Sequence, residues 1–75
     1  MFIKFSRHAK RRIKLHKIPD ALISTLLRKT TYSFGQQEIV EYVPGFHFPI
    51  KVIFDVQGKI ITVITAYPFK KGNKQ

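Results

Sequence analysis

Two histidines and an arginine recur at intervals of four residues near the start of the chain. His8, Arg12 and His16 lie within residues 6–17, a stretch that also holds five further lysines and arginines. At about 100° per residue, a helix gathers the three side chains into one stripe. The stripe lies beside Leu15, on the side of the helix that is expected to face the core. Imidazoles that flank a guanidinium at a core margin indicate a site for a phosphate-containing partner.

Metal-independent cleavage of RNA is one chemistry that these residue types support. A base removes the proton of the 2′-hydroxyl, an acid protonates the leaving oxygen, and cations stabilise the charge on the phosphorane. Histidine suits both proton transfers because imidazole titrates near neutral pH, which makes His8 and His16 candidates. Arg12 suits the third task because a guanidinium matches two phosphate oxygens. Tyr67, near the end of the chain, could stack on a base or donate a proton.

Other residues could bind the RNA. Thr65 is expected on the same sheet face as Tyr67, two residues away, and Lys70 follows shortly after and could add positive charge. A second arc of the first helix is purely basic, and it could contact phosphates or remain solvated surface. Its residues with the strongest case for RNA binding are Lys10, Arg11 and Lys14.

Each candidate also has an ordinary structural alternative. His8 could fix the start of the helix through a hydrogen bond, and Arg12 could brace the helix against the sheet. His16 could be a solvated residue at the helix C-terminus. Tyr67 could be a core aromatic with its hydroxyl at the rim. His47 alternates with two phenylalanines and is expected to be a surface residue of a strand.

No metal or other cofactor is expected. His8 and His16 are eight residues apart, about 12 Å along a helix axis, which is too far to share one ion. The chain has no cysteine, and no pair of carboxylates is placed for a two-metal nuclease. A glycine-rich phosphate loop and a Ser-His-Asp set are also missing from the sequence.

The distribution of charge favours an anionic partner. The 75 residues carry a formal net charge of +10, and residues 1–37 hold nine lysines and arginines against Asp20 alone. Nucleic acid is the leading candidate, while an acidic protein or an anionic membrane surface could also neutralise this charge. The length allows one domain, residues 1–75. Because the chain has neither a membrane-spanning apolar run nor a signal-peptide core, we expect a cytoplasmic protein.

The periodicity of the sequence changes from helical to strand-like at about residue 30. It predicts a strand over 2–5, helices from 7 to 16 or 17 and over 19–29, and strands over 38–43, 46–56 and 59–67. The last segment is almost wholly β-branched and apolar, which is typical of a central strand. The order β-α-α-β-β-β indicates an α+β domain, with an antiparallel sheet and both helices packed on one face.

Two motifs at opposite ends of the chain resemble those of the RelE/ParE toxin superfamily. The first is His8-Ala9-Lys10-Arg11-Arg12, followed by His16-Lys17-Ile18, and the second is Val63-Ile64-Thr65-Ala66-Tyr67-Pro68. They are similar to the His-Ala-x-x-Arg and Val-x-x-Thr-x-Tyr-Pro patterns of short relatives of RelE and BrnT. Together with the order of elements, the resemblance spans nearly the whole chain. The chain departs from the family pattern at His16, where relatives often carry arginine.

The resemblance implies the toxin of a bacterial toxin–antitoxin pair. Such toxins are often metal-independent endoribonucleases that cleave mRNA, in some cases on the ribosome, and an antitoxin, here expected to be acidic, silences them. Two alternatives stay open because a shared fold does not determine chemistry. One is a non-enzymatic module of the same fold that binds nucleic acid or protein. The other is a ParE-like inhibitor of a protein target such as gyrase.

The basic arc generates a first prediction. Replacing Lys10, Arg11 and Lys14 with glutamine should weaken RNA binding, because each substitution removes a contact with a phosphate. With fewer contacts, RNA binding also releases fewer counterions. The slope of log affinity against log salt should flatten by roughly one for each lost contact. Fluorescence titrations of a labelled single-stranded RNA over a range of salt concentrations measure this slope. An unchanged slope would remove the arc from the RNA interface.

Overall fold

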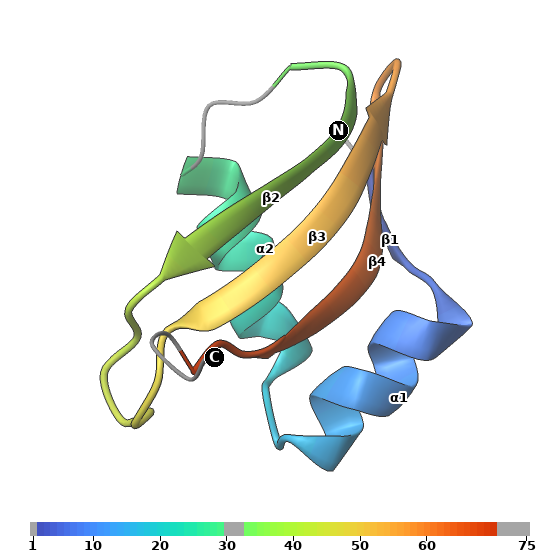
Figure 1. Cartoon of the computed structure of the whole chain (residues 1–75). Helices are drawn as coiled ribbons and strands as arrows, with labels where there is room; N and C mark the ends of the chain where they lie inside the picture. Colours follow the sequence, from blue (N-terminus) through green and yellow to red (C-terminus); the bar gives the residue numbers. More distant parts are fainter. Residues whose placement is uncertain (1, 30–32, 71–75) are drawn as a thin grey trace.

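The predicted order of helices and strands is confirmed. The computed structural model describes residues 2–29 and 33–70. The elements are β1 (Phe2–Phe5), α1 (Arg7–Leu15), α2 (Asp20–Lys29), β2 (Gly35–Glu41), β3 (Ile50–Gln57) and β4 (Ile60–Pro68). The four strands form one sheet in the order β1-β4-β3-β2, as Figure 1 shows. The chain therefore has the expected α+β fold. None of the described helices is long and apolar enough to cross a membrane.

The sheet is mixed, which modifies the expectation of an antiparallel sheet. The pairs β2–β3 and β3–β4 are antiparallel, but β1 runs parallel to β4, from Phe2 opposite Ile60 to Phe5 opposite Val63. Short loops join the three later strands, and a short connection can only reverse the direction of the chain. β1 and β4 are separated by most of the chain, so no hairpin constrains their relative direction.

Ser6 forms the junction between β1, α1 and β4. Its hydroxyl oxygen accepts a hydrogen bond of 3.0 Å from the Ala9 N–H, as the N-cap of α1, and donates one of 2.9 Å to the Ile64 carbonyl. The Ser6 N–H donates to the Val63 carbonyl at 3.0 Å. Because β1 ends here, α1 takes its place and packs along the second half of β4 (Figure 1).

Both helices are slightly shorter than predicted at the turn between them. Lys17 has a φ of 55°, a left-handed conformation that cannot continue a helix. The Ile18 N–H instead donates to the Ile13 carbonyl at 2.8 Å, which closes the end of α1 and buries Ile18. Pro19 precedes α2, and its carbonyl accepts hydrogen bonds from the N–H groups of Leu22 at 3.1 Å and Ile23 at 3.4 Å. The turn thus brings α2 back under the sheet.

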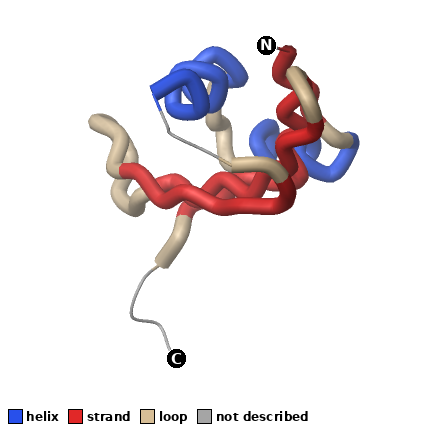
Figure 2. Tube along the Cα trace, turned by 90° about the horizontal axis from the view of Figure 1, so that it is seen from above, coloured by secondary structure: helices blue, strands red, loops and turns tan. Residues whose placement is uncertain are grey.

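The core lies between the sheet and the two helices. Alternate residues of β3, from Ile50 to Val56, form one buried cluster with Ala9 and Ile13 of α1 and with α2. Figure 2 shows α2 over one face of the sheet, with α1 on the same side along its edge. The opposite face, here called the open face, carries Lys51, Ile53 and Asp55 of β3 and the residues paired with them. No described helix covers the open face, so its side chains can meet a partner.

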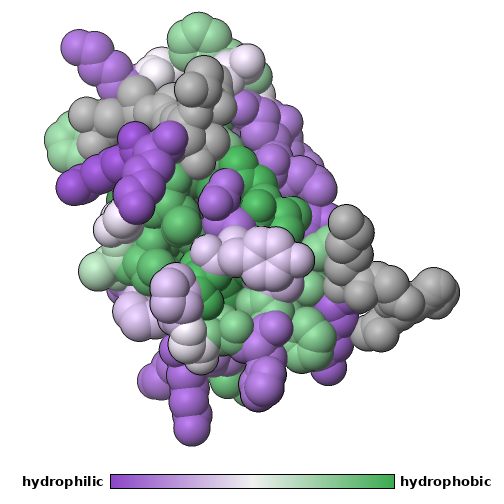
Figure 3. All heavy atoms as spheres, turned by 90° about the vertical axis from the view of Figure 1, so that its left-hand side faces the viewer, coloured by the Kyte–Doolittle hydropathy of each residue, from purple (hydrophilic) through white to green (hydrophobic). Residues whose placement is uncertain are grey.

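The core is also incompletely covered on the β2 side. Leu22 of α2, Ile39 of β2, and Val43 and Phe46 after β2 are only partly buried, although they pack against the core. Seen from this side, hydrophobic surface gathers in the middle of the molecule, with hydrophilic side chains around it (Figure 3). In so small a protein, the two helices do not enclose the whole sheet.

The position of Ser6 generates a second prediction. Ser6→Ala removes the helix cap and leaves the Ile64 carbonyl without its donor, so the free energy of unfolding should fall by about 1–2 kcal/mol. Urea denaturation measures the change. Ser6→Thr keeps the hydroxyl and should retain most of the stability. Thr25→Ala is a matched control, because that hydroxyl donates only to the Ala21 carbonyl of its own helix. Equal effects of Ser6→Ala and Thr25→Ala would contradict the role of Ser6.

Candidate functional site

A β-bulge in β4 determines which side chains reach the open face. Val63 pairs with Phe54 and Thr65 pairs with Ile53, so Ile64 is an extra residue in β4. Val63 faces the core, and without the extra residue Thr65 and Tyr67 would face it too. The bulge turns them to the open face instead. The Ser6 hydroxyl donates to the carbonyl of the bulged residue.

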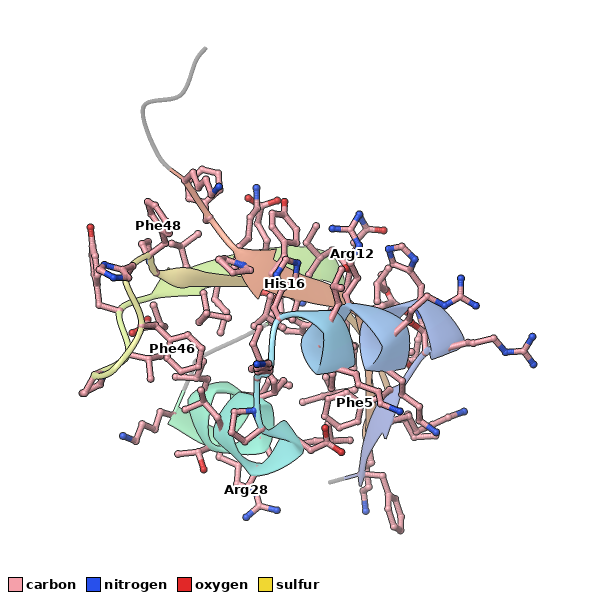
Figure 4. All side chains as sticks on the ribbon, turned by 90° about the horizontal axis from the view of Figure 1, so that it is seen from below. Phe5, Arg12, His16, Arg28, Phe46 and Phe48 are labelled. Carbon is pink, nitrogen blue, oxygen red and sulfur yellow. The ribbon has the colours of Figure 1, made fainter. Side chains whose placement is uncertain are left out.

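Arg12 of α1 and Tyr67 of β4 meet at the margin of the open face. The guanidinium carbon of Arg12 lies 5.8 Å from the centre of the Tyr67 ring, within the ~6 Å range of a cation–π interaction. In the part of the chain that the structure describes, no carboxylate pairs with Arg12 and its side chain makes no hydrogen bond. Figure 4 shows Arg12 and His16 on the side of α1 away from α2. The guanidinium N–H groups are therefore available to an anion.

Lys51 places a second cation on the other side of Tyr67. It is the cross-strand partner of Tyr67 on β3, and its Nζ lies 3.1 Å from a carboxylate oxygen of Glu38 on β2 and 4.8 Å from the centre of the Phe69 ring. The hydrogen bond with Glu38, supported by the nearby Tyr67, raises the pKa of Lys51 above its ordinary value of 10.5. Tyr67 therefore stands between two cations, Arg12 and Lys51.

Thr65 adds a hydroxyl to the same face. Its side chain is 9% exposed, and its Oγ1 has no hydrogen-bond partner among the residues described. A buried hydroxyl without a partner is unfavourable by about 1–3 kcal/mol. Because the Oγ1 atom itself is buried, the contact between Thr65 and RNA stays a prediction.

The predicted histidine–arginine stripe is divided between different surroundings. His8 is exposed in the first turn of α1, whereas Arg12 is half-buried against β4. His16 caps the end of α1, and its N–H donates to the Arg12 carbonyl at 3.0 Å. Leu15 is 70% exposed, so its side of the helix does not face the core as expected. The reason is that α1 packs along a strand edge and buries only the side that carries Ala9 and Ile13.

The basic arc lies on the surface, outside the Arg12–Tyr67 contact. Lys10, Arg11 and Lys14 are exposed. Lys10 and Lys14 line a hollow of about 500 Å³ with Lys17 at the turn between the helices. Lys70 is exposed beyond β4, and its Nζ lies 5.5 Å from the centre of the Phe48 ring. Lys10 and Lys14 thus lie on the side of α1 that faces the turn to α2, opposite to Arg12.

Sequence reasoning missed two members of the site, and it placed His47 correctly on the surface but wrongly in a strand. Lys51 stands between buried neighbours in a strand, a signal that it faces the other side of the sheet, but only the register places it beside Tyr67. Glu38 joins through its ion pair with Lys51. His47 was predicted in a strand, but it lies in the loop before β3, which starts at Ile50, after Pro49. Proline has no N–H for a strand hydrogen bond.

Within residues 2–29 and 33–70, no group of three or more histidine, aspartate or glutamate side chains could hold a metal ion. Comparisons of the chain with protein-family models, with curated proteins and with solved structures found no match. The case for a function therefore rests on the residues of the site and on their placement.

The ion pair beside Tyr67 generates a third prediction. Because the pKa of Lys51 is raised in the folded protein, its stabilising effect is complete below the pKa of an unfolded lysine and is lost as the pH rises through the folded value. The stability difference between the wild type and Glu38→Gln should therefore be steady at neutral pH and shrink above about pH 10.5.

Denaturant unfolding at a series of pH values tests this expectation. Glu41→Gln is the matched control, because Glu41 also lies on β2 but forms no ion pair among the described residues. The stability difference between the wild type and Glu41→Gln should be the same at neutral and alkaline pH. If the stability difference between the wild type and Glu38→Gln persists at alkaline pH, the role of Lys51 is contradicted.

Proposed function

We propose that this chain is a metal-independent endoribonuclease, the toxin of a bacterial toxin–antitoxin pair that acts in the cytoplasm. One observation carries the proposal: the phenol of Tyr67 stands between Arg12 and Lys51 on a sheet face that no described helix covers. A phenol between two cations can bind a phosphate and transfer a proton. The motif resemblance to RelE-like toxins supports the same function, because Arg12 and Tyr67 belong to the two motifs.

The proposed reaction uses the RNA's own 2′-hydroxyl as the nucleophile. The 2′-oxygen loses its proton to a base and bonds to phosphorus, while the bond from phosphorus to the 5′-oxygen breaks and that oxygen takes a proton from an acid. The products are a 2′,3′-cyclic phosphate and a 5′-hydroxyl end. Arg12 and Lys51 stabilise the charge on the phosphorane. Tyr67 is placed for one proton transfer, and His8 on the exposed side of α1 is the candidate for the other.

The positive charge of the first helix suits RNA and an antitoxin. Lys10, Arg11 and Lys14 are exposed on the same helix as Arg12 and can contact backbone phosphates. The net charge of +10 favours rapid association with RNA, whether free or on the ribosome. The same charge would attract an acidic antitoxin that covers α1 and β4 in the silenced state.

A non-enzymatic RNA-binding module is the second candidate. The observation that favours it is the placement of the histidines, because His8 is exposed and His16 lines a separate hollow. Tyr67 is thus the one proton-transfer group found between two cations in the described chain. A sheet face with cations and an aromatic ring could bind RNA without cleaving it.

The proposed site generates a fourth prediction. Arg12→Ala should lower the cleavage rate by about 10²–10³, as for the loss of one charge-stabilising donor. Tyr67→Phe removes the phenolic proton and should lower the rate by about 10²–10⁴. The assay follows a labelled single-stranded RNA with a chelator present, and mapping of RNA 5′ ends after induced expression in bacteria tests the activity in cells.

Matched controls separate the site from general effects. Tyr42→Phe is the same substitution at a tyrosine that is 80% exposed and lies outside the site, and it should cleave like the wild type. Circular dichroism melts should show that all the variants are folded. Cleavage that survives both Arg12→Ala and Tyr67→Phe in folded protein would exclude this site. Tight RNA binding without cleavage by the wild type would support the non-enzymatic module.

A further inference from the structure

A second hollow lies beside the Arg12–Tyr67 pair. Its volume is about 330 Å³, and three segments distant in sequence form its walls: the end of α1, the loop between β2 and β3, and the end of β4. The lining residues are His16, Phe46, His47, Phe48, Pro68 and Lys70. His16 follows Arg12 by about one helical turn, and Pro68 directly follows Tyr67. The hollow therefore lies next to the proposed cleavage site without including its residues.

The walls combine flat apolar surfaces with polar ring edges. The rings of His47 and Phe48 are 6.4 Å apart between centres and inclined at 52°, and Phe48 is 40% exposed. Figure 4 shows Phe46 on the α2 side of the sheet and Phe48 on the opposite side. The Lys70 ammonium lies 5.5 Å from the centre of the Phe48 ring. The hollow thus offers aromatic surface, two imidazoles and a fixed positive charge.

We propose that this hollow binds one nucleobase of the RNA, next to the phosphate held by Arg12 and Lys51. The proposal rests on the proposed function and names a base subsite for it. A planar base can stack against Phe48, while His16 and His47 can each donate or accept a hydrogen bond at the edge of the base. Lys70 would attract the adjoining phosphate. The volume is at the lower end of the range for small-ligand sites, as a single base requires.

Other occupants use fewer of these features. A metal ion would find two imidazoles, a neighbouring ammonium that repels it, and no third described ligand. An acidic side chain could pair with Lys70 but would leave the aromatic walls without a partner. A base with its phosphate uses the rings, the imidazoles and the cation together. His16 is accordingly assigned to base recognition, whereas imidazole chemistry had made it a candidate for proton transfer.

Nucleoside 5′-monophosphates provide the test, with inorganic phosphate as the probe that lacks a base. Each of the four common ribonucleotides is titrated into the full-length chain, and NMR follows the imidazole signals of His16 and His47. At least one nucleotide should shift both signals at millimolar concentrations, whereas inorganic phosphate should not. His47→Ala and Phe48→Ala should each lower the affinity for that nucleotide by roughly 5- to 100-fold.

Matched controls and a second assay make the result decisive. Tyr42→Ala removes another exposed aromatic side chain that does not line the hollow, and it should leave nucleotide affinity unchanged. His47 and Phe48 are both exposed, so the thermal unfolding curves of His47→Ala and Phe48→Ala should match that of the wild type. In RNA cleavage, His47→Ala should change the base found at the cut sites.

The outcomes separate this inference from the proposed function. Cleavage of RNA by the wild type, with no nucleotide that shifts His16 and His47, would overturn the base subsite and leave the nuclease intact. Nucleotide binding in the hollow without any cleavage of RNA would support the subsite and contradict the nuclease. Equal affinity for nucleotides in the wild type, His47→Ala and Phe48→Ala would also overturn the subsite.

Discussion

The hydroxyl of Ser6 links the two elements that carry the candidate site. It accepts a hydrogen bond from the first turn of α1 and donates one to the Ile64 carbonyl, at the bulge in β4. The first bond sets where the helix begins, and hence where Arg12 lies. The second supports the extra residue that turns Tyr67 away from the core. The cation–π contact between Arg12 and Tyr67 therefore depends on one small side chain at a chain junction.

The sheet divides structural and functional tasks between its two faces. One face, with α1 and α2, forms the buried cluster around Phe54. The open face holds Lys51, Glu38 and Tyr67, and Tyr67 contacts Arg12 at its margin. A chain of this size can enclose only one core. Its other sheet face can therefore carry charge, at some cost in stability, since the cations repel one another.

A phosphate site beside a base-sized hollow gives the proposed ribonuclease a consistent design. The cations around Tyr67 would hold and stabilise the reacting phosphate, and the aromatic hollow would choose the nucleotide beside it. The hollow includes the exposed loop residues His47 and Phe48, which can vary without disturbing the core, whereas Phe46 of the same loop packs against the core. The chemistry and the selectivity would then reside in different parts of the chain, and an acidic antitoxin that covers the cations would block both.

The residue pattern alone predicts the helices and strands and two candidate residues of the site. Helical and strand periodicity predicted the β-α-α-β-β-β order and the basic first helix, and the chemistry of the side chains made Arg12 and Tyr67 candidates. These features follow from local geometry, which repeats every 3.6 or two residues. The folded arrangement was needed to reveal the parallel pairing of β1, the bulge, the place of Lys51 beside Tyr67, and the hollow around His16 and His47. Each of these depends on register and packing between segments that are distant along the chain, and a local period does not encode them.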